Sequence, residues 1–329
     1  MNRKFLIYSL KLLVSLLIII VLARSFDFSQ VYSRLDDLSY RYIIFALFVS
    51  FLLAISNTFR WQIILRIIDH PIAFWSALKM QYIAGFFNQA LPSIVGGDAV
   101  RVYLCYKAGT PLQKSLNSVI LERMIILSSL IFLVTILQIF VIEQMREGYA
   151  HYIFPVLSFG AVLGTALVMI LDRLPSELQH FRVIRGFSNM AVDARRIFLS
   201  LKNSMTTMAL GLLGNVLLSI IAYLVAKSLG VEIQIIDALV LVPPAILVSS
   251  LPISIAGWGV REGAMVATLA YAGVSEVDAI IISVIFGVTI AVSSLPGACF
   301  WLMNKRDKKK QEKQNLGCKS KDLKMSIEQ

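Results

Sequence analysis

Long apolar segments with few charges run through most of this chain, and they limit the folds that it can adopt. The sequence is 57% hydrophobic and only 16% charged, whereas a soluble domain carries roughly 25% charged residues. The mean hydropathy is +0.76. Because the apolar residues form long blocks rather than amphipathic stripes, the pattern predicts an all-α integral membrane protein.

Two of these apolar segments are broken by the same short motif. The first copy, at 91–101, reads LPSIVGGDAVR, and the second, at 251–261, reads LPISIAGWGVR; the shift between them is 160 residues. Pro and Gly interrupt helices, so each copy predicts a hairpin. The predicted hairpin residues are Pro92, Gly96, Gly97, Pro252, Gly257 and Gly259. In membrane transporters, paired interruptions in the two halves point to a binding site.

Six further apolar segments are long enough to span a membrane. They lie near residues 5–23, 42–64, 117–142, 152–171, 206–226 and 279–303. The segment 5–23 also fits a signal peptide, and the symmetry of the halves favours a span. Arg60 lies at the far end of the second span. Between 172 and 205, the spacing of apolar residues predicts an interfacial amphipathic helix.

The distribution of Lys and Arg predicts the orientation of the spans. The N-terminus, the segment 172–205 and the tail 304–329 are basic and belong in the cytoplasm. The acidic loop 143–149 then lies outside only if each broken segment enters and leaves on one side. We therefore expect six transmembrane helices plus two re-entrant hairpins as an inverted repeat, with halves at about 1–150 and 151–303.

The net charge of +11 is concentrated in the tail, which holds nine Lys/Arg and four Asp/Glu. Such a run binds anionic lipid or nucleic acid in some proteins. A topology signal on a disordered cytoplasmic tail is the favoured interpretation, and no nucleic-acid partner is expected.

Ionisable residues inside a membrane are costly and mark candidate functional sites. Arg101 and Arg261 each follow a Gly-rich break, in the first turn of the resuming helix. Free N–H groups and the positive helix end favour an anion there, and a guanidinium fork fits phosphate. Both arginines could instead pair with local carboxylates and hold the hairpins. The other candidate substrate-binding charges are Asp98, Glu122, Arg123 and Glu262. One of the carboxylates would carry a coupling proton or form a fixed ion pair.

The sequence contains no pattern typical of a metal site, a disulfide framework or a hydrolase. The three Cys lie at 105, 299 and 318, without CxxC spacing, and the three His are isolated. There is no GxSxG, HExxH or Walker motif. We therefore expect no catalytic residues, no metal and no cofactor.

Three motifs in order resemble one membrane protein family. They are Pro92-x(4)-Gly97-Asp98-x-x-Arg101-x-Tyr103, then Leu121-Glu122-Arg123, then Gly257-x-Gly259-x-Arg261-Glu262. This combination is similar to the lysylphosphatidylglycerol synthase transmembrane-region family, also described as flippase-like, over roughly residues 5–303. The resemblance implies an inner-membrane lipid flippase-like domain and marks the same six charged residues as functional. The soluble aminoacyl-transfer domain of larger relatives has no counterpart in this sequence, so the resemblance favours a non-enzyme.

The sequence therefore predicts translocation of a membrane lipid, or of a lipid-linked head group, through a cavity between the two hairpins. The expected partners are the inner (plasma) membrane and a phospholipid or polyprenyl-phosphate-type lipid. A second copy of the chain and a lipid-synthesis enzyme are the protein partners considered. Two alternatives stay open at this stage. One is a membrane-embedded transferase acting on a lipid carrier, and the other is a non-catalytic partner of a lipid or envelope synthesis complex.

Overall fold

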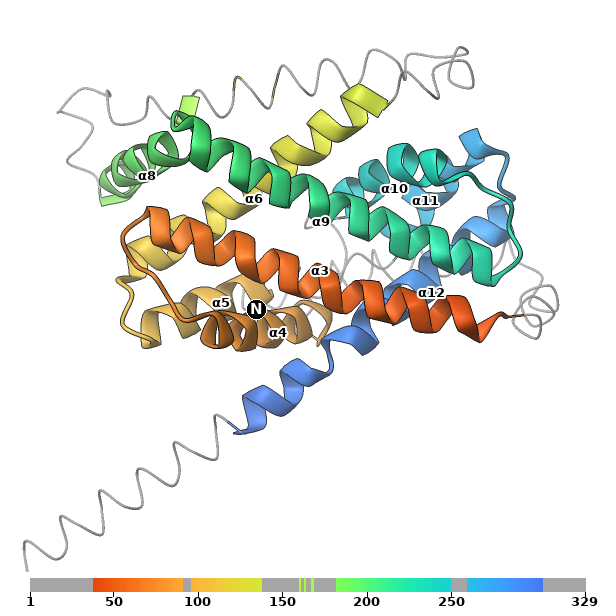
Figure 1. Ribbon diagram of the computed structural model, residues 1–329, viewed down its shortest axis with the longest axis horizontal. Coiled ribbons are helices and arrows are strands. Elements are labelled where there is room, and N and C mark those ends of the chain that lie inside the picture. Colours follow the sequence, from red (N-terminus) through yellow and green to blue (C-terminus); the bar gives the residue numbers. More distant parts are fainter. Residues whose placement is uncertain are drawn as a thin grey trace, which may run out of the picture.

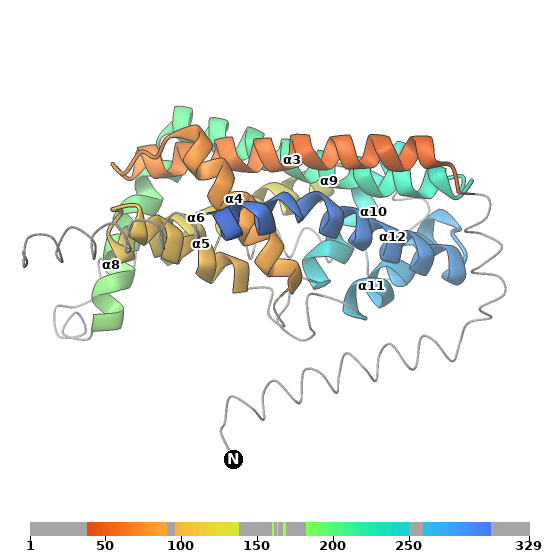
Figure 2. The ribbon, with the colours of Figure 1, turned by 90° about the horizontal axis from the view of Figure 1, so that it is seen from below.

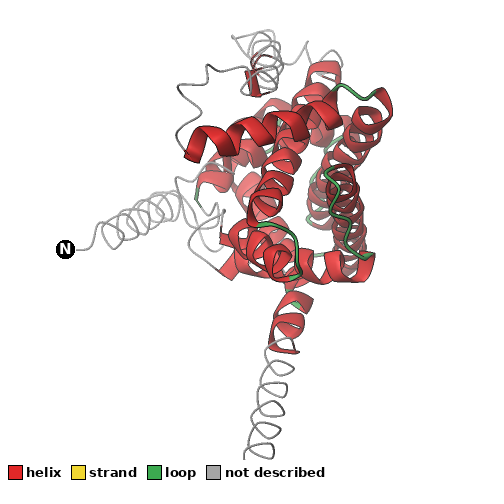
Figure 3. Cartoon of the chain, turned by 90° about the vertical axis from the view of Figure 1, so that its left-hand side faces the viewer, coloured by secondary structure: helices red, strands yellow, loops and turns green. Residues whose placement is uncertain are grey.

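The computed structural model describes residues 38–90, 96–137, 160, 163, 167–168, 182–249 and 259–303, and these are mainly helical, with no strand among them (Figure 3). The prediction of an all-α membrane protein is confirmed for this part of the chain. The helices are α3 (Tyr40–Ile67), α4 (Phe74–Ala90), α5 (Gly96–Lys107), α6 (Leu112–Leu137), α8 (Arg182–Phe198), α9 (Leu201–Ser228), α10 (Ile235–Ser249), α11 (Val260–Leu269), η4 (Ala270–Ala272) and α12 (Glu276–Ser294).

Four helices are long and apolar enough to cross a membrane. They are α3, α6, α9 and the segment Glu276–Met303, which contains α12 and a further helical stretch after a turn at Leu295. Large apolar side chains of α3, among them Phe45 and Phe48, are exposed on the surface of the protein. In a bilayer such side chains contact lipid, which is as apolar as they are.

The remaining helices of the two broken segments are short. α4 has 17 residues, α5 has 12, α10 has 15 and α11 has 10. A helix needs about 20 apolar residues to cross the hydrocarbon core at 1.5 Å per residue. α4 packs against α5, and α10 packs against α11. Within the described residues, each broken segment is therefore a pair of contacting helices, both shorter than the helices of the four candidate spans.

The helices of the first half recur in the same order in the second. α3, α4, α5 and α6 begin at Tyr40, Phe74, Gly96 and Leu112, and α9, α10, α11 and α12 begin at Leu201, Ile235, Val260 and Glu276. Corresponding helices thus start 161 to 164 residues apart, close to the 160-residue shift of the motif. Both α3 and α9 have 28 residues.

The corresponding helices α3 and α9 lie side by side and antiparallel (Figures 1 and 2). The backbone N–H of Ser39, at the start of α3, donates to the carbonyl of Ser228, at the end of α9, at 2.8 Å. In Figure 2 this pair forms one layer, and α4, α6, α10 and α12 lie beneath it. The core of the second half lies between α9, α10, α11 and α12, around residues such as Ile221, Leu241 and Phe286.

The segment 172–205 does contain an amphipathic helix, α8, but from Met190 onward its apolar stripe packs against protein. Met190, Ala194 and Ile197 are buried and pack against Ile64 of α3 and Leu121 of α6. The expectation of an interfacial helix is corrected in this respect, because the packing of neighbouring helices covers the apolar stripe.

Polar contacts fix the same face of α8. Asp193 is fully buried, with Lys114 Nζ at 2.6 Å from Oδ1 and Asn117 Nδ2 at 2.9 Å from Oδ2. A buried carboxylate with two donors fixes the register of the helix against α6.

Several predicted features lie outside the described residues. These are the first span at 5–23, the hairpin residues Pro92, Pro252 and Gly257, the loop 143–149 and the tail 304–329. Of the predicted span 152–171, residues 160, 163, 167 and 168 are helical. The other spans have the predicted places, with ends within about five residues of those expected from hydropathy.

Candidate functional site: a buried charge network beside a polar cavity

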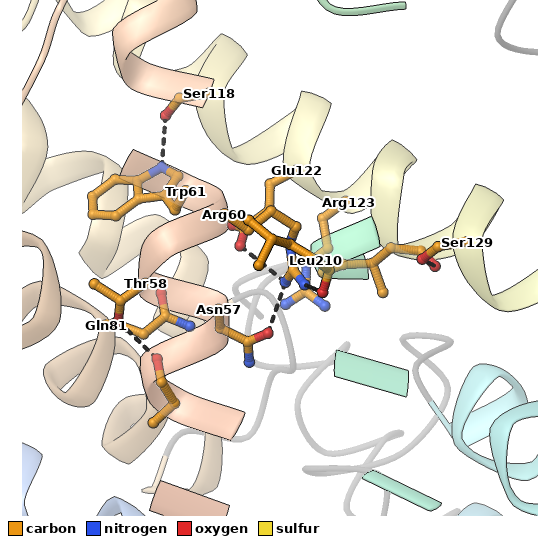
Figure 4. Close-up of polar contacts among 12 residues, drawn as sticks. Asn57, Thr58, Arg60, Trp61, Gln81, Ser118, Glu122, Arg123, Ser129 and Leu210 are labelled. Carbon is orange, nitrogen blue, oxygen red and sulfur yellow. Dashed lines mark hydrogen bonds and ion pairs between the residues drawn. The ribbon is translucent and has the colours of Figure 1, made fainter. Parts of the chain in front are cut away.

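Glu122 on α6 joins two arginines that come from other helices. Its Oε1 lies 3.2 Å from Nη2 of Arg60 on α3, and its Oε2 lies 2.6 Å from Nη1 of Arg101 on α5. Figure 4 shows Arg60 and Glu122 meeting between α3 and α6. One carboxylate therefore connects α3 with the consecutive helices α5 and α6.

Asp98 extends this network to a third arginine. Its Oδ1 lies 3.4 Å from Nη2 of Arg101, and its Oδ2 lies 2.7 Å from Nη2 and 2.8 Å from Nε of Arg123. The five groups carry three positive and two negative formal charges, so one positive charge is not neutralised by the network. Arg123 is the most exposed of the three arginines, with 45% of its side chain accessible.

The centre of the network is buried. Arg60 is 2% exposed, Arg101 is 3% exposed and Glu122 is 1% exposed. Taking such ions out of water costs several kcal/mol each unless opposite charges and hydrogen bonds compensate. A position of this kind in a membrane protein therefore depends on every partner that surrounds it.

Neutral groups supply the remaining contacts of the two buried arginines. Asn57 Oδ1 accepts from Arg60 Nη2 at 2.9 Å, and the Leu210 carbonyl of α9 accepts from Nη1 at 3.3 Å (Figure 4). Gln81 Oε1 on α4 accepts from Arg101 Nη1 at 2.7 Å. The guanidinium carbon of Arg101 also lies 5.0 Å from the centre of the Trp61 ring, within the range of a cation–π interaction.

The start of α5 places Asp98 and Arg101 at this point. A Cβ at Gly97 would lie 2.0 Å from the Ala84 carbonyl oxygen of α4, so only glycine permits this approach of the two helices. The Gly97 N–H donates to Asn88 Oδ1 at 2.9 Å. The broken segment thus allows α5 to begin against α4, and Asp98 and Arg101 follow one and four residues later.

A cavity of about 240 Å³ lies beside the network. α3, α4, α5, α6 and α12 all contribute to its wall, so it borders both halves of the chain. The polar residues that line it are Ser50, Asn57, Arg60, Gln81, Tyr82, Asn88, Gln89, Asp98, Arg101, Glu122, Arg123, Ser293 and Ser294. The Nε–H groups of Arg60 and Arg101 are buried and have no hydrogen-bond acceptor among the described residues. An anion is the ligand that such a cavity favours.

Arg261 and Glu262 form a second cluster, which does not line this cavity. Glu262 Oε1 lies 2.8 Å from Arg261 Nη2, and Ser283 Oγ of α12 lies 3.1 Å from both Arg261 Nε and Glu262 Oε1. The other oxygen of Glu262 accepts from the N–H of Gly259, whose φ is 86°. The side chains of Arg261 and Glu262 are 7% and 5% exposed. Glu262 thus joins the arginine to the backbone at the start of α11.

The second cluster is tightly packed. A Cβ at Gly287 of α12 would lie 2.2 Å from Arg261 Nη2, so the guanidinium occupies the space that a side chain would fill. The Phe286 ring centre lies 6.0 Å from the guanidinium carbon.

The structure thus brings four of the six predicted charges together at one cavity, namely Asp98, Arg101, Glu122 and Arg123. Reasoning from the sequence missed Arg60, Asn57 and Gln81 as members of the same site. A signal for Arg60 existed, because a guanidinium inside an apolar span needs a partner. Asn57 and Gln81 carry no such signal, since uncharged amides are common in spans. Among the described residues, no group of three His, Cys, Asp or Glu side chains could hold a metal ion.

The fold and the cavity define a class: an all-helical membrane protein with a polar, charge-lined cavity among its spans. Within this class, the chain belongs to the family of the lysylphosphatidylglycerol synthase TM region, whose sequence profile matches residues 8–297. The resemblance inferred from the three motifs is thereby confirmed. A comparison with curated protein sequences gives no match.

Proposed function

We propose that this protein moves a phosphate-bearing lipid, or a lipid-linked head group, between the leaflets of the inner membrane. One observation carries the proposal. The cavity among the membrane helices has an excess positive charge and two buried guanidinium N–H groups that have no acceptor in the described part of the chain. A phosphate oxygen accepts from such groups with charge-assisted hydrogen bonds. The family's lipid-related description supports the same class of substrate.

In this proposal Arg60, Arg101 and Arg123 contact the phosphate, and Asp98 and Glu122 hold the arginines in place. The apolar wall beside them, which includes Leu53 and Ile126, borders the first methylene groups of the lipid. One of the carboxylates Asp98, Glu122 or Glu262 carries the proton if transport is proton-coupled. Arg261 and Glu262 otherwise stabilise the second hairpin, since among the described residues they bond to each other, to Ser283 and to Gly259.

The transport mechanism follows from the two-fold arrangement that we propose for the chain. Six spans and two re-entrant hairpins form an inverted repeat, with both termini in the cytoplasm. The antiparallel contact of α3 with α9 supports this topology, because corresponding helices of inverted halves must run in opposite directions. Movement of one half against the other would open the cavity first to one leaflet and then to the other.

The test is translocation of a fluorescent phospholipid by the purified full chain in liposomes. Arg101→Ala is expected to slow translocation per folded molecule by about tenfold or more, since charged hydrogen bonds to the phosphate are lost. Arg196→Ala is the control, because Arg196 pairs with Asp69 and lies outside the cavity wall. A folded Arg101→Ala protein with the wild-type rate would exclude this cavity as the substrate site.

A further inference from the structure

The four carboxylate oxygens of the cavity all lie within ion-pair distance of arginines, although Glu122 Oε2 makes no hydrogen bond with the described residues. Asp98 directs Oδ1 to Arg101 and Oδ2 to Arg123. Glu122 directs Oε1 to Arg60 and Oε2 to Arg101. Each of the four carboxylate oxygens thus has a guanidinium partner within 3.4 Å. An ammonium group entering the cavity would have to compete with an arginine for any of these oxygens.

Three amide side chains of the wall also use their oxygens as acceptors within the protein. The oxygens of Asn57, Gln81 and Asn88 accept from Arg60, Arg101 and the Gly97 N–H, respectively. An amide carries one oxygen and one NH₂ group, so each of these three residues keeps its NH₂ donor. These donors add to the Nε–H groups of Arg60 and Arg101, which lack an acceptor among the described residues.

The other side-chain acceptors of the wall are uncharged. Ser50, Ser293 and Ser294 donate their hydroxyl protons to carbonyls of their own helices, at 2.8, 2.8 and 2.7 Å, and keep lone pairs. Tyr82 adds a phenol oxygen and Gln89 adds a neutral amide. Neutral oxygens stabilise an ammonium group far less than a carboxylate does, because charge-assisted hydrogen bonds are roughly twice as strong.

From these contacts we propose that the cavity selects lipids with an anionic, acceptor-rich head group that has no ammonium group. A phosphodiester with a hydroxylated substituent, such as glycerol or a sugar, fits this description. Aminoacylated head groups such as lysylphosphatidylglycerol, which carry ammonium groups, are rejected although the family is described by that lipid. The inference rests on the proposed function and specifies the substrate class of the same site.

The size of the cavity agrees with a head group rather than a whole lipid. Its volume of about 240 Å³ is below the roughly 300–1,000 Å³ of pockets that enclose drug-sized ligands. The acyl chains would therefore stay in the bilayer, beside the exposed apolar side chains of the spans.

The experiment compares three fluorescent tracers with identical acyl chains in the same liposomes, containing the full chain. The tracers are phosphatidylglycerol, phosphatidylcholine and lysylphosphatidylglycerol. Phosphatidylglycerol is expected to move about tenfold faster than the other two, or more. Equal rates for all three, or faster movement of a tracer with a quaternary or primary ammonium, would overturn the inference while the proposed function stands. No movement of any tracer above protein-free liposomes would overturn both.

Two variants of Gln81 test directly whether the hydrogen-bond donors of the cavity wall select the head group. Gln81→Glu keeps the oxygen that Arg101 needs and replaces the NH₂ donor by a charged acceptor. It is expected to change the ratio of phosphatidylglycerol to lysylphosphatidylglycerol rates by about tenfold in favour of the cationic lipid. Gln81→Met removes both the NH₂ donor and the oxygen that Arg101 uses, without adding charge, and is expected to slow phosphatidylglycerol without speeding the cationic lipid. An unchanged ratio in folded Gln81→Glu would show that the donors do not select the head group.

Discussion

Arg101 and Arg261 occupy matching positions of the repeated motif, yet their surroundings differ. Arg101 shares Glu122 with Arg60 and borders a cavity. Arg261 has its own neighbouring carboxylate, Glu262, and packs against Gly287 without reaching that cavity. Both contact the next α-helix in the chain, through Glu122 of α6 and Ser283 of α12 respectively. The comparison teaches that the motif sets where the arginine lies, and the facing helix sets whether space remains for a ligand.

The excess charge of the two clusters also differs. Among the described residues, the first cluster has three arginines and two carboxylates, whereas the second has one of each. A balanced, closely packed pair stabilises a hairpin, and an unbalanced network beside a cavity can attract an anion.

The largest effect is expected from removing the shared carboxylate. Glu122→Ala leaves the Arg60 and Arg101 charges buried without their common partner, which should lower the free energy of unfolding by about 3–5 kcal/mol. Thermal unfolding of the protein in detergent measures the loss. Glu232→Ala, a change at a loop carboxylate between α9 and α10, is the control. A Glu122→Ala protein as stable as this control would show that the network does not depend on its central carboxylate.

The packing of the second cluster is tested by adding one methyl group. Gly287→Ala would place a Cβ at 2.2 Å from Arg261 Nη2 and force the guanidinium to move. Overpacking of this kind should cost about 1–3 kcal/mol of stability. Gly263→Ala on α11 is the matched control, since no atom lies within 4 Å of its added Cβ. Equal stability of the two variants would contradict the tightly packed description of the cluster.

One conservative change in each cluster tests whether the first cluster binds the substrate and the second only stabilises the fold. Lysine keeps the charge but lacks the bidentate fork of arginine. Arg101→Lys is expected to slow lipid translocation per folded molecule by about tenfold. Arg261→Lys should lower stability and leave the rate per folded molecule near that of the wild type. If Arg261→Lys slows transport as strongly in fully folded protein, both clusters serve the substrate and the contrast between them fails.

The smallest effect is expected at Ser283. Its hydroxyl oxygen contacts Arg261 Nε and Glu262 Oε1, both at 3.1 Å. Ser283→Ala should lower the free energy of unfolding by about 0.5–1.5 kcal/mol, the usual range for one hydrogen-bonded group. A denaturant or thermal titration in detergent can resolve this value. Ser129→Ala provides a comparison within the first half, because the Ser129 hydroxyl on α6 is also buried and accepts from Asn215. A loss several times larger at Ser283 would mean that the hydroxyl organises the whole cluster.

Much of the fold could be predicted because a membrane restricts the choices. Lipid cannot satisfy a free backbone N–H or C=O, so an apolar run of sufficient length must be helical. This constraint explains why the spans at α3, α6, α9 and α12 have the places expected from hydropathy. α8 shows the limit of such reasoning. Its apolar stripe was visible in the sequence, but periodicity cannot tell whether lipid or protein covers that stripe.

The candidate site could be predicted only in part for a similar reason. Asp98, Arg101, Glu122 and Arg123 were found because charges stand out in apolar segments, and the structure brings them to one cavity. Arg60 belongs with them but lies on α3, which meets α5 and α6 only in the folded protein. Gln81 and Asn57 support the arginines through neutral hydrogen bonds, for which a single sequence gives no specific pattern.

The sequence by itself determined that this chain is a helical membrane protein with two matching breaks, each followed by an arginine. The physical reason is that apolar length, Pro, Gly and charge act locally along the chain. Only the tertiary structure decided that Arg101 shares a carboxylate with Arg60, whereas Arg261 packs against Gly287. Burial, ion pairing and empty space depend on which helix lies opposite, and that is a property of the packed helices together.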